Sequence, residues 1–200
     1  ALFMRRWTGA TDFVLGTPAS GRDAVELEAV VGPFVNTVTP RFSMRSDASF
    51  LDLLATTRQQ MLDALAHQHV PLDLLLRRIM PGRGPASAPL FQAMFAWQPL
   101  PPLAMPGLDC TRLPVEYETS KVDLTLFVFD EGESTRLTFE YSCDLFREAT
   151  MTDALAAFEQ LARSAVAQPR VPGDRLGWIT DEQRTRVLSS AQGPASAYAR

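Results

Sequence analysis

Residues 121–129 have the sequence KVDLTLFVF, and residues 136–141 have the sequence RLTFEY. Apolar and polar side chains alternate along both segments, which is the two-residue period of a β-strand with one buried face. In the first segment the apolar side chains are Val122, Leu124, Leu126 and Val128. Asp123 and Thr125 are expected on the opposite, polar face. Because Gly132 lies between the segments, the pattern predicts a β-hairpin.

Further strands are predicted upstream of this hairpin. Residues 12–16 form a short apolar run, residues 34–39 are β-branched and aromatic, and residues 90–97 are largely apolar. Pro40 ends the second of these strands, because proline has no backbone N–H to donate to a sheet. Residues 17–22 contain proline, serine and glycine and are expected to form a loop.

Helices are predicted over residues 49–67, 72–79 and 150–167, and residues 1–7 are expected to close a helix. In the longest of the three, apolar side chains share one face at helical spacings; they are Phe50, Leu53, Leu54, Met61 and Leu65. The corresponding stripe of the last helix is Met151, Leu155, Phe158 and Ala162. These helices and strands indicate an α+β fold, a mixed sheet with packed helices.

The composition is that of a globular chain. Of 200 residues, 46% are hydrophobic and 21% are charged, which excludes disorder over the whole length. A formal net charge of −4 argues against a nucleic-acid partner. No apolar run approaches the ~20 residues of a membrane-spanning helix, and the first residues lack the order of a signal peptide. Cys110 and Cys143 lie far apart, which suits a reducing cytoplasm and predicts no disulfide framework.

No catalytic constellation stands out from the residues alone. His67 and His69 point about 200° apart on a helix, so they cannot share a metal ion as an i, i+4 pair could, and no metal site is expected. Cys110 and Cys143 have no nucleophile signature and are expected to be packed as small apolar residues. Asp123 is expected to be solvated or paired with Lys121, although a polar role at a site stays open.

Several segments, in order along the chain, resemble motifs of the condensation domains of nonribosomal peptide synthetases, specifically their C-terminal lobe. They are residues 14–22 (VLGTPASGR), 31–41 (VGPFVNTVTPR), 67–73 (HQHVPLD), 87–92 (SAPLFQ) and 121–126 (KVDLTL). The third departs from the family pattern HQDxPFE at His69, Leu72 and Asp73. Residues 176–184 (LGWITDEQR) resemble the linker that leads into an adenylation domain.

The resemblance implies a chloramphenicol-acetyltransferase-like lobe that forms a V with a second, N-terminal lobe, with the active site in the tunnel between them. It assigns residues 1–168 to the C-terminal lobe and residues 169–200 to a linker. The last dozen residues are small and polar, so the end of this linker is expected to be disordered. The resemblance also implies that a floor loop at residues 16–30 and a latch within residues 80–106 cross to the other lobe.

The implied reaction is amide formation. An amine on the acceptor carrier protein attacks the thioester carbonyl of the acyl group on the donor carrier protein, and both substrates are attached to phosphopantetheine arms. No cofactor is expected to bind this chain directly. The catalytic HHxxxDG motif of the family lies in the N-terminal lobe and is absent here. The chain is therefore expected to be inactive alone and to have no catalytic residue of its own.

Asn36 and Arg41 are the candidates for the tunnel wall. Asn36 follows Phe34 and Val35 on a predicted strand, and its amide can donate a hydrogen bond into an apolar tunnel. The alternative is that it bonds neighbouring backbone. Arg41, after the strand, can line the tunnel or can be a structural ion-pair partner; the second role is favoured.

Two other functions remain open at this point. A catalytically silent condensation-like module would keep the fold and would bind carrier proteins or recruit a tailoring enzyme. An epimerisation domain is a third option, and the run FVNT at residues 34–37 favours condensation over it. The sequence upstream of Ala1 would separate an active domain from a silent module, because an intact HHxxxDG motif is expected there only in an active domain.

Overall fold

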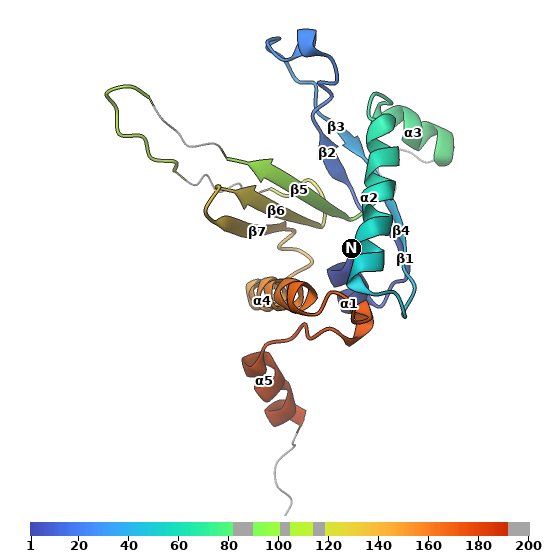
Figure 1. Cartoon of the computed structure of the whole chain (residues 1–200), viewed down its shortest axis with the longest axis vertical. Helices are drawn as coiled ribbons and strands as arrows, with labels where there is room; N and C mark the ends of the chain where they lie inside the picture. Colours follow the sequence, from blue (N-terminus) through green and yellow to red (C-terminus); the bar gives the residue numbers. More distant parts are fainter. Residues whose placement is uncertain (82–89, 101–104, 114–118, 192–200) are drawn as a thin grey trace, which may run out of the picture.

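The computed structural model describes residues 1–81, 90–100, 105–113 and 119–191. Its largest sheet has three strands, which are β5 (Ala93–Pro99), β6 (Leu124–Asp130) and β7 (Thr135–Tyr141). β5 pairs with β6 in parallel, and β6 pairs with β7 antiparallel (Figure 1). The predicted hairpin is confirmed, and Gly132, with φ of 86°, lies in its turn.

The central strand β6 is buried more completely than its alternation suggested. Leu124, Leu126 and Val128 are buried as expected, but Thr125 is only 3% exposed. The polar face expected at Thr125 is therefore not exposed. The reason is tertiary: β6 has a strand on each side, and Thr125 lies in register between Met94 of β5 and Glu140 of β7, whose side chains flank it.

A two-stranded antiparallel ribbon lies beside this sheet (Figure 1). Its inner half pairs β1 (Asp12–Val14) with β4 (Arg41–Ser43), and its outer half pairs β2 (Thr17–Ala19) with β3 (Asn36–Val38). The expected loop at 17–22 is thus partly a strand, because β3 supplies the hydrogen-bond partners for its backbone. Arg41 belongs to a strand of its own, β4, which the sequence patterns did not predict.

Gly16 joins the ribbon to the three-stranded sheet. Its N–H donates to the carbonyl of Ala93 (3.0 Å), and its carbonyl accepts from the N–H of Phe95 (2.9 Å). A Cβ atom at Gly16 would lie 2.5 Å from the ring of Phe91, so only glycine permits this approach. The ribbon therefore extends from a fixed point on β5, and the chain between β2 and β3 lies at its far end (Figure 1).

The core lies between the sheet and two helices, α1 (Leu2–Thr8) and α4 (Glu148–Ala167). Phe3 packs edge-on against Phe158 at 5.6 Å between ring centroids and lies 6.2 Å from Phe139 of β7. α4 is confirmed, but its buried stripe differs from the predicted one. The fully buried residues of α4 are Met151, Ala154, Ala157, Leu161 and Ala165, whereas Ala162 is exposed.

The predicted helices α2 (Phe50–Ala66) and α3 (Leu72–Ile79) are confirmed. Ser49 caps α2 with a reciprocal pair of hydrogen bonds: its Oγ accepts from the N–H of Asp52, and its own N–H donates to the Asp52 carboxylate. Neither helix contains a fully buried residue, and Leu54 of α2 is 52% exposed. The apolar face predicted for α2 is therefore only partly covered.

The chain that follows α4, expected to be mostly linker, is folded against the core in its first part. Leu176 is 2% exposed and belongs to the core, and Asp174, in the short 3₁₀ helix η2 (Gly173–Arg175), pairs with Arg5 of α1. A further helix, α5 (Asp181–Ala191), comes next. The expected disordered end, residues 192–200, lies outside the described residues.

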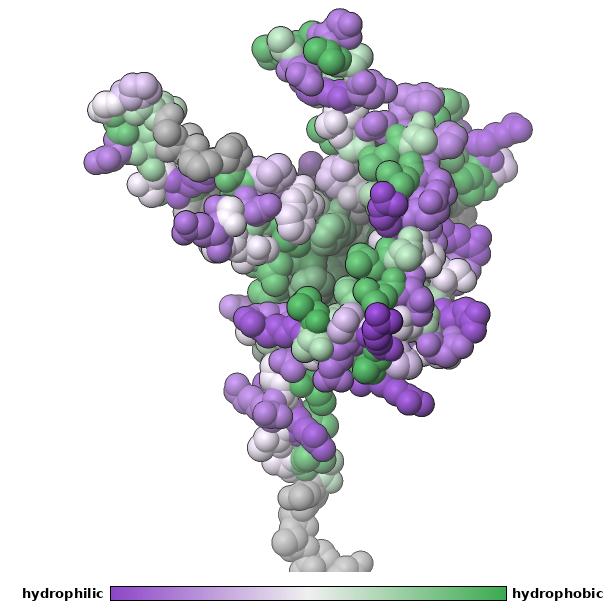
Figure 2. All heavy atoms as spheres, viewed as in Figure 1, coloured by the Kyte–Doolittle hydropathy of each residue, from purple (hydrophilic) through white to green (hydrophobic). Residues whose placement is uncertain are grey.

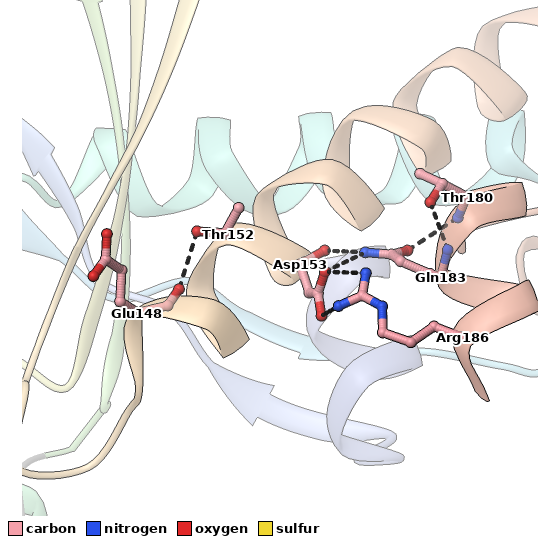
Figure 3. A network of polar contacts seen from close by, with 6 residues as sticks. All are labelled: Glu148, Thr152, Asp153, Thr180, Gln183 and Arg186. Atoms are coloured by element: carbon pink, nitrogen blue, oxygen red, sulfur yellow. Dashed lines mark hydrogen bonds and ion pairs between the residues drawn. The ribbon is translucent and has the colours of Figure 1, made fainter. Parts of the chain in front are cut away.

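Polar contacts attach α5 to α4 (Figure 3). Thr180 and Gln183 form a capping box at the start of α5: the Gln183 N–H donates to Thr180 Oγ1 (3.2 Å), and the Thr180 N–H donates to Gln183 Oε1 (3.0 Å). Asp153 of α4 accepts from Arg186 at its carboxylate (2.9 Å) and from Gln183 at its carbonyl (2.7 Å). The first turns of α5 are thereby held against the body of the fold.

Candidate functional site

Asn36 does not point freely into open space. Its Nδ2 donates to the carbonyl of Gln68 (2.7 Å) and to the carbonyl of Val70 (2.6 Å), both in the turn between α2 and α3. A primary amide has two N–H donors, and both are engaged here. Asn36 therefore joins the motif segment 31–41 to the segment 67–73, and this geometry supports the alternative in which it bonds backbone.

Arg41 lies on the exposed side of the ribbon. Its Nε donates to Oδ1 of Asp12 (2.8 Å), and its Nη2 donates to Oδ2 of the same carboxylate. The hydrogen bond from Arg41 lowers the pKa of Asp12, and the partner carboxylate raises the pKa of Arg41. This bidentate pair supports the structural role for Arg41. For both Arg41 and Asn36, a place in a tunnel wall stays a prediction.

The remaining polar candidates are separate from one another. His67 and His69 are exposed, and the His67 ring contacts the carbonyl of Asp63 at its Nδ1 (2.9 Å). Cys110 is half-buried, whereas Cys143 is exposed, so the expected packing is wrong for Cys143. Within the described residues, no three or more His, Cys, Asp or Glu side chains gather in a way that could hold a metal ion.

A concave apolar face lies between the sheet and α2. Figure 2 shows apolar side chains gathered in this hollow, with polar ones around it. The large apolar side chains that are exposed on the two elements beside it are Phe95, Trp97, Leu51, Leu54, Leu62 and Leu65. A separate apolar cavity of about 210 Å³ is lined by residues that include Phe95, Phe139 and Phe158. Exposed apolar area of this extent favours a partner surface.

Sequence reasoning missed two arginines that organise the structure. Arg5 is buried in the middle of α1, where its Nε donates to Asp174 (2.8 Å) and its Nη1 donates to the carbonyl of Met44 (3.1 Å). Arg22 lies at the start of the segment between β2 and β3 and contacts Phe34 at the end of that segment.

The expected latch, residues 80–106, lies partly outside the described residues. No helix of the described chain has the length and apolar character needed to cross a bilayer.

Solved structures share this arrangement of helices and strands. A four-domain nonribosomal peptide synthetase in its holo form, bound to AMP and glycine, superposes with a TM-score of 0.79 at 20% identity, over 92% of this chain and 15% of that chain. The first condensation domain of the calcium-dependent antibiotic synthetase superposes with a TM-score of 0.69 at 21% identity, over 90% of this chain and 39% of that chain. The fold is therefore the chloramphenicol-acetyltransferase-like α+β fold of condensation domains.

The chain belongs to the condensation domain family, whose sequence profile matches residues 1–188. A protein of the linear gramicidin synthase of Brevibacillus parabrevis is 35% identical over 199 residues, which are 98% of this chain and 3% of that protein. Tyrocidine synthase 3 of the same organism is 29% identical over 99% of this chain and 3% of its own length. The chain thus spans only a few hundredths of the length of the relatives that it matches.

Proposed function

We propose that this chain is the C-terminal lobe of a condensation domain that forms peptide bonds. The family match over residues 1–188 carries the proposal. Its partners are an N-terminal lobe of the same domain, a donor and an acceptor carrier protein with their phosphopantetheine arms, and an adenylation domain downstream. The segment after residue 168 then leads toward that adenylation domain, held at its start by the contacts of α5 with Asp153.

In the proposed reaction, the amine of the acceptor attacks the thioester carbonyl of the donor. A C–N bond forms, the C–S bond breaks, the thiolate of the donor arm leaves, and the amine loses a proton. Removing this proton and stabilising the oxyanion require groups that the resemblance places on the N-terminal lobe. This lobe contributes the apolar wall visible in Figure 2, which excludes water, and the turn that Asn36 holds.

The full-length protein tests the proposal. The full-length protein is mixed with a donor acyl thioester and an acceptor aminoacyl thioester, each attached to its carrier protein. The condensed product is followed by mass spectrometry. We expect product only when both carriers bear their phosphopantetheine arms. No turnover with carriers that still bind would instead support the catalytically silent module.

Replacing Asn36 by alanine should lower stability and activity together. The change leaves the carbonyls of Gln68 and Val70 without their donor, and each such loss costs on the order of 1–3 kcal/mol where water cannot replace it. The unfolding free energy and the condensation rate of the full-length protein are measured side by side. Asn36→Asp, which keeps the shape but loses both donors, is expected to behave like Asn36→Ala.

The opposite pattern would restore the tunnel-wall role. Loss of a donor that acts on developing charge lowers a rate by about 10²-fold or more. A fall of this size with an unchanged melting temperature would show that Asn36 acts on the reacting atoms.

A further inference from the structure

The polar contacts that attach α5 to the rest of the described chain all meet at one residue of α4. Gln183 Nε2 donates to the carbonyl of Asp153 (2.7 Å), and the guanidinium of Arg186 donates to both oxygens of the Asp153 carboxylate (2.9 and 3.0 Å; Figure 3). Within the described residues, the other side-chain hydrogen bonds of α5 stay inside the helix or its cap. Asp153 is therefore a single point of attachment for these contacts.

The chain just before α5 is fixed in a different way. Leu176 is 2% exposed, and Trp178 packs against the core with the guanidinium of Arg6 at 5.5 Å from its ring centroid. Ile179, the next residue, is 43% exposed, and α5 itself contains no buried residue. The change from chain packed in the core to chain lying on the surface thus occurs between Trp178 and Thr180.

The contacts at Asp153 are of a kind that can open and close. The side chains of Asp153 and Arg186 are 43% and 54% exposed, so water and salt compete with their attraction. A helix as short as α5 is marginal in water by itself, and contact with α4 is what protects its amides from exchange. Two states of similar free energy follow, one with α5 docked on Asp153 and one with α5 released.

The side-chain amide of Gln183 couples the cap of α5 to this docking. Its Oε1 accepts from the N–H of Thr180 and caps the helix, while its Nε2 donates to the carbonyl of Asp153. The cap therefore orients the amide so that its nitrogen faces α4. A carboxylate at this position would keep the acceptor for the cap but would lose the donor for docking.

We propose that Asp153 is a releasable clasp, which holds α5 on α4 and whose opening lets the chain beyond Trp178 turn away from the lobe. In the docked state the end of α5 points in a fixed direction, and in the released state it turns about residues 179–180. A consequence, which rests on the proposed function, concerns the adenylation domain downstream. The clasp sets whether that domain moves together with this lobe or independently of it.

The experiment measures hydrogen exchange of the α5 amides, residues 184–191, in the full-length protein. Asp153→Ala and Gln183→Glu are the test variants, and we expect α5 to exchange about 3- to 10-fold faster in both. Glu159→Ala is the matched control, because Glu159 is another exposed carboxylate of α4 and pairs with Arg163 of the same helix. It should leave exchange in α5 unchanged, and residues 155–165 of α4 should exchange at the wild-type rate in both test variants.

Exchanging the two charges separates the clasp from a general effect on α5. Asp153→Arg alone and Arg186→Asp alone each place like charges together, so both should speed exchange at least as much as Asp153→Ala. The double variant should exchange at least about threefold more slowly than either single variant, because the opposite charges meet again. In about 1 M NaCl the difference between wild type and Asp153→Ala should fall by about half, since the Debye length is then only about 3 Å.

Several results would overturn the clasp. They are unchanged exchange in Asp153→Ala, equal acceleration by Glu159→Ala, a double charge exchange that restores nothing, and wild-type exchange in α5 at the rate of an unstructured peptide. Unchanged exchange in Gln183→Glu would show that the cap alone protects α5, which also contradicts the proposal.

The consequence for the downstream domain has its own measurement. Energy transfer between a fluorophore on this lobe and one on the domain that follows should report a broader distribution of distances in Asp153→Ala than in the wild-type protein. Equal distributions with faster exchange would overturn the link between the clasp and that domain. Absence of condensation by the wild-type protein would overturn the proposed function, and the exchange data would still decide whether Asp153 holds α5.

Discussion

The 200-residue chain alone is expected to form no amide above the uncatalysed rate. The HHxxxDG motif that the family uses is absent from its sequence, and the two candidate polar side chains are engaged in structural contacts. Both donors of Asn36 go to backbone carbonyls, and Arg41 pairs with Asp12. A positioned proton acceptor contributes about 10²–10⁴-fold to a rate, and an oxyanion donor about 10²–10³-fold. Without a proton acceptor and without an oxyanion donor, the chain should show no condensation activity that the assay can detect.

The measurement compares the purified chain with the full-length protein, with identical donor and acceptor thioesters on their carriers. Circular dichroism and a cooperative unfolding transition serve as the control that the chain is folded. Product formation by the folded chain alone would contradict the assignment of the catalytic groups to the other lobe, and a base would then have to be sought among the residues of this lobe.

Replacing Asp174 by alanine is expected to lower the free energy of unfolding by about 2–4 kcal/mol, because it leaves the buried Arg5 charge without its carboxylate. Arg5 is 9% exposed, and the neutral carbonyl of Met44 would remain as an acceptor for it. The double variant Arg5→Met with Asp174→Ala should recover part of the loss, since no unpaired charge is then buried. The free energy of unfolding of the wild-type chain and of both variants is measured by chemical denaturation.

The same pair predicts a specific acid sensitivity. The hydrogen bond from Arg5 holds the pKa of Asp174 below its ordinary value of 3.8, so the ionised carboxylate stabilises the folded state. This contribution is fully present above the unfolded pKa and disappears as the pH falls through the lower pKa of the folded state. Asp174→Ala should therefore lose less stability on acidification than the wild-type chain does.

Asp47→Ala is the control for this prediction. It removes the carboxylate of an exposed arginine pair, Arg45 with Asp47, and exposed pairs contribute little to stability because water screens them. Equal destabilisation by Asp47→Ala and Asp174→Ala would show that burial of Arg5 does not matter.

Local sequence patterns correctly predicted the helices and strands that depend on neighbouring residues alone. The β6–β7 hairpin follows from alternation around Gly132, and α2 begins at Ser49 because Ser49 and Asp52 satisfy each other's backbone groups. The same patterns were misleading where the burial of a side chain depends on segments far away in the sequence. Thr125 is buried although it was expected on the polar face, because β6 has a strand on each side. In α4 the buried face includes Ala154 and Ala157, which were not in the predicted stripe.

By itself, the sequence determined the α+β class, the hairpin, the helices and, through its ordered motifs, the family. Only the tertiary structure decided what the polar residues do, because their partners lie far away along the chain. Arg5 meets Asp174 169 residues later, and Asn36 meets Gln68 32 residues later. Side-chain periodicity reports which face of an element is apolar. It carries no information on which backbone carbonyl or carboxylate the folded chain brings within hydrogen-bond distance of a given amide or guanidinium.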